Sequence, residues 1–255
     1  MSSASVSYLI CATPRSGSTL LCELLAASGV AGTPDSFFMD PVDPVWRAEW
    51  KLPAPELSRT KGYAAAYLDA AIAAGSGGTG VFGLRLMQKD LAGLLALIGA
   101  VHPGAGSDQA RLAAAFGRVS YLHLTRSDKL GQAISLVKAE QTGLWHRAAD
   151  GRELERLSPP QAPEYDFARI RAKLAALEAY DAAWRAWFAA QGITPMTVAY
   201  EELAARPTET IAAICRALGV TLPASVHLVP EVARLADGLN RDWAARFRAD
   251  SAALG

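Results

Sequence analysis

The hydrophobic positions of the chain follow two alternating patterns. Short, nearly continuous apolar runs are typical of parallel strands buried on both faces, and they occur at residues 7–12, 81–87, 117–125 and 194–200. Apolar residues at three- and four-residue steps indicate helices, which we expect at residues 17–28, 57–74, 89–101, 107–116, 129–142, 165–191, 207–218 and 240–249. Strands that alternate with helices predict an α/β fold of three layers, with a mostly parallel sheet of four or five strands flanked by helices.

Two long segments fit neither pattern. Residues 31–55 are too irregular for regular structure and too aromatic for a disordered linker, since they combine several prolines with Phe37, Phe38, Trp46 and Trp50. Long ordered loops are commonly functional, so we expect this one at the mouth of a site. Its aromatic side chains form either an apolar wall for a sugar ring or anchors to the core. Residues 145–163 are polar and predict a second loop.

The first predicted strand leads directly into the most distinctive motif of the chain, Thr13-Pro14-Arg15-Ser16-Gly17-Ser18-Thr19. A strand, a tight loop and a helix in this order direct backbone N–H groups and the positive end of a helix dipole toward one point, which favours an anion. The Ser and Thr residues could instead serve only as helix N-caps. A cap, however, needs no cation at the positive end of a helix, so Arg15 indicates a strongly charged anion such as phosphate or sulfate.

This loop differs from the loop of nucleoside triphosphatases, which requires G-x-x-x-x-G-K-[ST] with a Lys on the terminal phosphates. Here the loop has one Gly and no Lys. It resembles the shorter loop with which sulfotransferases hold the 5′-phosphosulfate of 3′-phosphoadenosine 5′-phosphosulfate (PAPS). By this resemblance Arg15 is catalytic, and the donor is bound by Arg15, Ser16, Gly17, Ser18 and Thr19.

The same resemblance implies a second motif: an Arg at the end of a later strand and a Ser about nine residues further on, which together hold the 3′-phosphate. Arg126 follows the strand predicted at 117–125, and Ser135 lies nine residues beyond it in the next predicted helix. The whole chain resembles bacterial carbohydrate sulfotransferases of the trehalose 2-sulfotransferase type, including residues 29–32, the aromatic pair at 37–38 and residues 184–188. We therefore expect a single domain, residues 1–255, with a P-loop-like sulfotransferase fold.

In the reaction implied by this resemblance, a sulfuryl group moves from PAPS to a hydroxyl of a carbohydrate or a related small molecule, without a metal. The acceptor hydroxyl must lose a proton to a base within reach. In the trehalose 2-sulfotransferase type the proposed base is a Glu immediately before the aromatic pair, a place that Ser36 occupies here. Asp35 is our first candidate, although consecutive residues of an extended loop point in opposite directions. The alternatives are Asp40, Asp43 and His123.

Other candidate residues for binding the acceptor lie in the segment 31–55 and in the second predicted strand. Arg85 lies near the carboxyl end of the second predicted strand, where parallel sheets bind ligands, although a surface ion pair would explain it equally well. We expect the acceptor to contact Ser36, Phe37, Phe38, Trp46 and Arg85.

The composition of the chain bears on its macromolecular partners and on its cellular compartment. The 25 Lys and Arg residues equal the 25 Asp and Glu residues in number, so no overall field attracts nucleic acid or a membrane surface. No apolar run is long enough to span a bilayer, and three widely spaced Cys residues favour a reducing cytoplasm. The apolar segment 37–50 could contribute to a homodimer.

Two other functions stay open at this point. One is a P-loop-type kinase or nucleotidase of the same fold class, which the missing loop Lys argues against. The other is a homologue that binds PAPS or its product, 3′-phosphoadenosine 5′-phosphate (PAP), with altered or lost catalysis, because Ser36 cannot act as a base.

Overall fold

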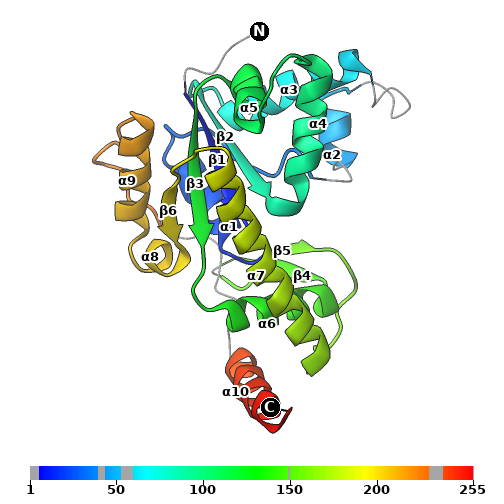
Figure 1. Ribbon diagram of the computed structural model, residues 1–255. Coiled ribbons are helices and arrows are strands. Elements are labelled where there is room, and N and C mark those ends of the chain that lie inside the picture. The colour runs from blue at the N-terminus through cyan, green and yellow to red at the C-terminus, as the bar shows by residue number, and fades with distance from the viewer. Residues whose placement is uncertain (1–5, 40–43, 53–59, 149, 230–237, 255) are drawn as a thin grey trace.

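The computed structural model of the protein describes residues 6–39, 44–52, 60–148, 150–229 and 238–254. Its centre is a parallel sheet in the order β2-β1-β3-β6, made of β1 (Val6–Ala12), β2 (Val81–Met87), β3 (Val119–Thr125) and β6 (Met196–Ala199) (Figure 1). The four strands predicted from apolar runs are all present. Because all the pairs are parallel, the carboxyl ends of the four strands meet at one edge, where such sheets bind ligands.

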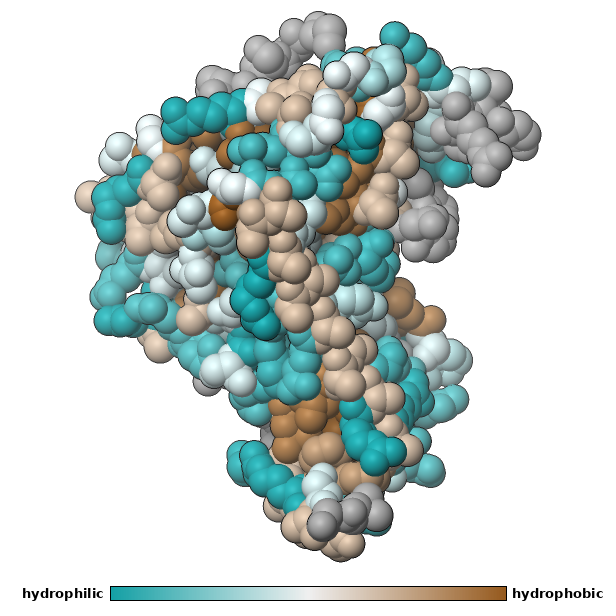
Figure 2. All heavy atoms as spheres, viewed as in Figure 1, coloured by the Kyte–Doolittle hydropathy of each residue, from teal (hydrophilic) through white to brown (hydrophobic). Residues whose placement is uncertain are grey.

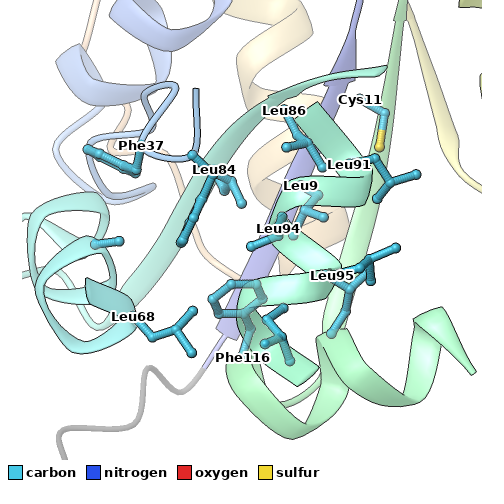
Figure 3. Close-up of a cluster of buried hydrophobic side chains, with 14 of the residues drawn as sticks. Leu9, Cys11, Phe37, Leu68, Leu84, Leu86, Leu91, Leu94, Leu95 and Phe116 are labelled. Carbon is cyan, nitrogen blue, oxygen red and sulfur yellow. The ribbon is translucent and has the colours of Figure 1, made fainter. Parts of the chain in front are cut away.

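Helices cover both faces of the sheet, as the predicted three-layer fold requires. On one face, Tyr8 and Ile10 of β1 pack against α1 (Ser18–Ala27), α8 (Tyr200–Ala205) and α9 (Pro207–Leu218). On the other face, Leu9 and Cys11 pack against α3 (Lys61–Ser76), α4 (Leu91–Val101), α5 (Asp108–Phe116) and α7 (Phe167–Ala190). Figure 3 shows Leu94 and Leu95 of α4 beside the strand residues of this second cluster. The burial of β1 on both faces explains why its apolar run does not alternate.

A third apolar cluster lies beyond the sheet. It joins α6 (Lys129–Thr142) and α7 to the C-terminal helix α10 (Gly238–Leu254) through Trp243 and Phe247. In Figure 1 α10 lies at one end of the molecule, below α6, and Figure 2 shows apolar surface in this region. None of the helices in the described part of the chain is long and apolar enough to cross a membrane.

The structure corrects four predictions of secondary structure. Residues 145–163, predicted to be a loop, contribute to an antiparallel hairpin of β4 (Leu144–Arg147) and β5 (Glu153–Arg156). The irregular segment 31–55 contains α2 (Pro44–Glu49), with Pro at its first position. Residues 201–203, which the sequence predicts to form a short turn, belong to α8. The helix predicted at 57–74 has the composition of an exposed helix, but it buries one side as α3. The two strands of the hairpin are four residues long and do not alternate between apolar and polar residues, and α2 and α8 are short, so none of the three carries a periodic signal.

The remaining bounds agree with the prediction to within a few residues. The helix expected at 89–101 begins with a short 3₁₀ turn, η2 (Gln88–Asp90), before α4. α6 and α9 have the predicted bounds, and Asp128 caps α6 by accepting a hydrogen bond from the Gly131 N–H at 2.9 Å. The well-defined helix starts therefore fix the short loops that connect each strand to the next helix. The site lies at these loops.

Candidate active site

The loop between β1 and α1 has a strained backbone that its sequence explains only in part. Gly17 has φ +92° and Arg15 has φ +61°, a left-handed conformation that residues with a Cβ rarely adopt. The Ser16 N–H donates to the Thr13 carbonyl at 3.2 Å and closes the turn. Gly17 is the N-cap residue of α1 and has no side chain with which to cap it. The start of α1 therefore presents backbone N–H groups rather than a capped end, which disfavours the N-cap alternative.

The structure brings the two motifs of the sequence together. The Arg15 Nε–H donates to Ser135 Oγ at 3.1 Å, and Arg126 Nη1 donates to the Arg15 carbonyl at 3.1 Å. Residues more than a hundred positions apart thus meet at the carboxyl ends of β1 and β3. The nine-residue spacing of Arg126 and Ser135 places Ser135 on the side of α6 that faces the loop, so that both residues contact Arg15.

Positive charge is concentrated at this point. Burial and the neighbouring Arg126 lower the pKa of the Arg15 guanidinium to about 10, so it stays a cation at neutral pH. Its Nη1 also donates to the Trp145 carbonyl of β4 at 2.7 Å. Ser16 Oγ and Arg126 Nε are buried and have no hydrogen-bond partner among the described residues. Two guanidinium groups and unpaired donors in one place form a site suited to a polyanion.

Three further residues shape the loop and were not predicted from the sequence. The Tyr200 ring lies under Arg126, 4.8 Å from the guanidinium carbon, and packs so closely on Gly17 that an added Cβ would be 2.3 Å from it. Gln132 Nε2 donates to Thr13 Oγ1 at 2.9 Å and to the Pro14 carbonyl at 2.7 Å. Trp184 Nε1 donates to the Ala12 carbonyl at 3.0 Å. Tyr200 and Gln132 lie in a predicted strand and a predicted helix, and Trp184 lies in a predicted helix and in the segment 184–188 of the resemblance. The sequence assigns none of them a role at the loop, because single polar contacts carry no periodic signal.

A pocket of about 470 Å³ opens beside the loop, on the side of Thr19. It is lined by Thr19, Cys22, Glu23, Ala26, Thr33, Pro34, Asp35, Phe37, Ala74, Arg85, His146 and Glu155. The lining is rich in charged and polar groups and includes part of the segment 31–39. The pocket is therefore suited to a polar small molecule that would lie next to an anion held by the loop.

Arg85 joins the pocket to the loop. Its Nη1 donates to Thr19 Oγ1 at 2.9 Å, its Nε donates to Ser36 Oγ at 2.7 Å, and its Nη2 forms an ion pair with Asp35 Oδ1 at 2.7 Å. Asp35 and Ser36 thus face the same guanidinium, which corrects the expectation that they point in opposite directions. The reason is local: the Ser36 N–H donates back to Asp35 Oδ1 at 2.7 Å.

Most of the aromatic residues of this segment anchor it to the core. Phe38 is buried and packs 5.4 Å from the Tyr67 ring, while Trp46 stacks on Trp50 at 5.6 Å. Phe37 contacts both tryptophans and also lines the pocket. Of the aromatic pair and Trp46, Phe37 is the member that the structure puts at the pocket, and the other two lie behind it.

The hairpin supplies two pocket residues that the sequence did not indicate. His146 Nε2 of β4 is 3.2 Å from Thr19 Oγ1 and 3.3 Å from Glu155 Oε2 of β5. Burial, Arg15 and Arg85 lower the pKa of His146 to about 4. The imidazole is therefore neutral at pH 7.

The alternative bases are not at the pocket or cannot be described. His123 of β3 is buried on the face of the sheet opposite α1, against the Phe188 ring at 5.3 Å. Burial lowers its pKa. Asp40 and Asp43 lie outside the described residues.

The pKa of His146 has a consequence for stability. An unfolded His binds a proton near pH 6.5, whereas the folded chain holds His146 neutral down to about pH 4. Below pH 6.5 the unfolded state therefore binds more protons, and the folded state loses stability as the pH falls toward 4. Between pH 7 and pH 5 we expect the parent to lose about 1–2 kcal/mol more of its unfolding free energy than His146→Gln. Urea unfolding of both proteins at the two pH values measures the difference, and equal losses would contradict it.

Comparison with known proteins identifies the family. The model of the Stf0 sulphotransferase family matches residues 7–250. Trehalose 2-sulfotransferase of Mycolicibacterium smegmatis is 31% identical over 283 residues, covering 98% of this chain and 97% of the relative. The enzyme of the same name from Mycobacterium tuberculosis is 30% identical over 273 residues, covering 100% of this chain and 99% of the relative.

Two of the solved structures found by comparison are sulfotransferase domains. The domain from the curacin biosynthetic pathway has a TM-score of 0.49 and 14% identity and covers 86% of this chain and 75% of that one. The domain from the Synechococcus PCC 7002 olefin synthase has a TM-score of 0.45 and 15% identity, with 95% and 94% covered. The family match and the two enzyme relatives confirm the resemblance based on the two motifs and the expected enzyme class. The chain belongs to the Stf0 sulphotransferase family.

Proposed function

We propose that this enzyme transfers a sulfuryl group from PAPS to a hydroxyl group of a carbohydrate. The observation that carries the proposal is the convergence of Arg15, Arg126 and Ser135 at one end of the sheet, beside a polar pocket. The family match and the two trehalose 2-sulfotransferases support the reaction type and the class of acceptor.

The residues at the loop fit the donor. Ser16 Oγ and Arg126 Nε are buried polar atoms that lack partners among the described residues, as donors waiting for an anionic ligand would. Arg15, Ser16, Gly17, Ser18 and Thr19 would hold the 5′-phosphosulfate, and Arg126 and Ser135 the 3′-phosphate. When bound, PAPS supplies an activated sulfuryl group and a phosphate that can leave. Arg15 and the N-terminus of α1 supply fixed positive charge where the leaving phosphate gains negative charge.

The acceptor would occupy the pocket beside Thr19. Its volume, about 470 Å³, lies within the usual range for small-molecule sites. Arg85 and Asp35 offer a donor and an acceptor for sugar hydroxyls, and Ser36 and Phe37 lie next to them. Asp35, the base predicted from the sequence, lies in this pocket. Trehalose, the acceptor named for both relatives, is the first sugar to test.

Calorimetric titration with PAP, with ATP and Mg²⁺ as the control, tests the donor. We expect tight binding of PAP and none of ATP, because the loop lacks the Lys that reaches terminal phosphates. Binding of ATP alone would favour the kinase alternative. Binding of PAP without transfer from PAPS to trehalose or to any other sugar of a panel would favour the homologue without catalysis.

The second motif makes a separate prediction. Arg126→Ala should weaken PAP binding by about 2–3 kcal/mol, or about 30- to 150-fold in Kd, because a charge-assisted contact to the 3′-phosphate is lost. Adenosine 5′-phosphate, which has no 3′-phosphate, should lose less than about threefold. Titration of both nucleotides against both proteins gives the comparison. A variant that still distinguishes them as the parent does would refute the role assigned to Arg126.

Three wider predictions from the sequence complete the proposal. Residues 1–255 would act as one sulfotransferase domain, and the enzyme would work in the cytoplasm, where Cys11, Cys22 and Cys215 remain the free, buried thiols seen here. A homodimer formed through the segment 37–50 also stays a prediction. Size-exclusion chromatography with light scattering measures the oligomeric state.

A further inference from the structure

The pocket holds more than one group that can accept a proton from an acceptor hydroxyl. Among the described residues its lining contributes the carboxylates of Glu23, Asp35 and Glu155 and the imidazole of His146. The Cys22 thiol also lines it, but burial raises its pKa to about 12, so it is neutral and not a base near pH 7. The base must lie at the boundary between the loop and the pocket, because the reacting oxygen and the sulfuryl group meet there.

Asp35 is poorly suited to this task. Its Oδ1 accepts hydrogen bonds from the Ser36 N–H and from Arg85 Nη2, both at 2.7 Å. Arg85 uses the same guanidinium to hold Thr19 and Ser36. A proton on Asp35 would remove the charge that keeps Arg85 in place, and so would loosen the end of the loop. Asp35 is therefore built to position Arg85.

The hairpin of β4 and β5 is attached to both ends of the loop. The Trp145 carbonyl accepts a hydrogen bond from Arg15 Nη1 at 2.7 Å, and the next residue, His146, contacts Thr19 Oγ1 at 3.2 Å. Two successive residues of β4 thus touch the first cation and the last hydroxyl of the motif. His146 Nε2 is also 3.3 Å from Glu155 Oε2, which brings a carboxylate of β5 to the same boundary. Glu23 lies one helical turn further along α1 than Thr19, and so further from the loop at the start of the helix.

We infer that the His146–Glu155 pair, rather than Asp35, is the general base of the transfer. This inference rests on the proposed sulfotransferase function. In the step, the acceptor O–H bond breaks and its proton goes to the pair, where it is shared between His146 Nε2 and Glu155 Oε2. The acceptor oxygen forms the new O–S bond, and the electron pair of the old S–O bond leaves with the phosphate oxygen of the donor.

The charges around His146 make this step depend on the donor. Burial is the largest cause of the lowered proton affinity of the imidazole, and Arg15 from the loop and Arg85 from β2 lower it further. The carboxylates that line the same pocket, Glu155, Glu23 and Asp35, favour the protonated form through their charge. An anionic donor bound to the loop would offset the two guanidinium charges. The pair would therefore become a stronger base when the donor is in place, which links proton removal to a loaded site.

Three substitutions separate the two candidate bases. Glu155→Gln and His146→Gln should each lower kcat for transfer from PAPS to trehalose by 100-fold or more, with KM for trehalose within threefold of the parent. The double variant should be no slower than the slower single variant, because residues that act as a unit are not additive. Asp35→Asn should raise KM and lower kcat by less than tenfold. Glu153→Gln is the matched control: it lies on the same strand, is paired with Arg156, and should leave kcat and KM unchanged.

A titration that needs no acceptor provides the second measurement. NMR of the four histidines, with His146→Gln to assign the signal, should show that PAP raises the titration midpoint of His146 and that Glu155→Gln lowers it. A His146 midpoint that responds neither to PAP nor to Glu155→Gln would refute the assignment of the His146–Glu155 pair as the base. So would a hairpin variant that keeps kcat within threefold of the parent, or an Asp35→Asn variant that loses 100-fold.

The same experiments distinguish this inference from the proposed function. A parent protein that neither binds PAP nor transfers from PAPS would refute the donor assignment itself. A parent that binds PAP and sulfates trehalose while the hairpin variants remain active would refute only the base. If PAP binds and trehalose is not sulfated, the response of the His146 midpoint to Glu155→Gln still decides whether the two groups share a proton.

Discussion

Arg15→Ala should abolish sulfuryl transfer, with a fall in kcat/KM of about 10³-fold or more. The side chain is held at the loop by Ser135 and by the Trp145 carbonyl, and it keeps its charge at neutral pH even though burial and Arg126 lower its pKa to about 10. Such a fixed, desolvated cation stabilises charge that develops on a leaving phosphate far more than a solvated one. PAP binding should weaken strongly as well, because in the proposed site the same cation would face the 5′-phosphate.

The stability of the variant distinguishes a catalytic role from a structural one. Removing Arg15 relieves its repulsion with Arg126 and the cost of burying a charge, so we expect the melting temperature of Arg15→Ala to stay level or rise while activity is lost. Ala keeps the Cβ, and with it the left-handed strain at φ +61°, so backbone strain is constant between the two proteins. Arg111→Ala, on α5 and 3.8 Å from Asp108, is the control for loss of one positive charge. An Arg15→Ala enzyme that keeps a tenth of the parent kcat/KM would contradict the assignment.

Much of this site could be predicted because its elements are buried. β1 and β3 are covered on both faces, so their sequences are nearly continuous apolar runs whose ends locate Arg15 and Arg126. The nine-residue step to Ser135 then needs only the first two turns of α6 to be regular. Parallel pairing places the carboxyl ends of the strands on the same side of the sheet. Residues that directly follow two neighbouring strands are therefore expected to lie close together, even when they are far apart in the sequence.

The acceptor side could not be predicted in the same way. His146 and Glu155 lie on a short, polar hairpin whose strands have no apolar alternation, so the segment has the composition of a loop. Tyr200 follows the last strand, yet its contact with Gly17 depends on the position of β6 at the edge of the sheet. Phe38 was a candidate for the sugar wall because exposed and buried aromatics have the same sequence signature, and its burial against Tyr67 was decided by α3.

Gly17→Ala should damage both the stability of the fold and the anion site. The new Cβ would lie 2.3 Å from Tyr200 Cδ2, and the backbone would have to hold φ +92° with a side chain. Strain and overpacking each cost about 1–3 kcal/mol, so we expect the unfolding free energy to fall by about 2–4 kcal/mol. If the loop moves instead to avoid the ring, the N–H groups at the start of α1 lose their common direction, and PAP affinity should fall by tenfold or more.

A second glycine in the chain separates strain from collision. Gly29 has φ +70°, but an added Cβ there would meet no atom within 4 Å. Gly29→Ala should therefore cost only the strain of a left-handed residue, about 1 kcal/mol, and leave PAP binding unchanged. Urea unfolding and PAP titration of both variants give the comparison, and equal effects would show that the Tyr200 ring does not restrict the loop.

The Tyr200 ring can also be removed. In a Tyr200→Ala background, Gly17→Ala should lose its collision and keep only its strain, so the two substitutions should be coupled by about 1–3 kcal/mol in a double-mutant cycle. Tyr200 also supports Arg126 from below, 4.8 Å from its guanidinium carbon. The double variant should therefore regain the PAP affinity that Gly17→Ala loses by distorting the loop. It should not regain the affinity that depends on the support of Arg126 by the Tyr200 ring. A coupling near zero would mean that the loop and the end of β6 do not act on each other, and that the close fit at Gly17 has no part in shaping the anion site.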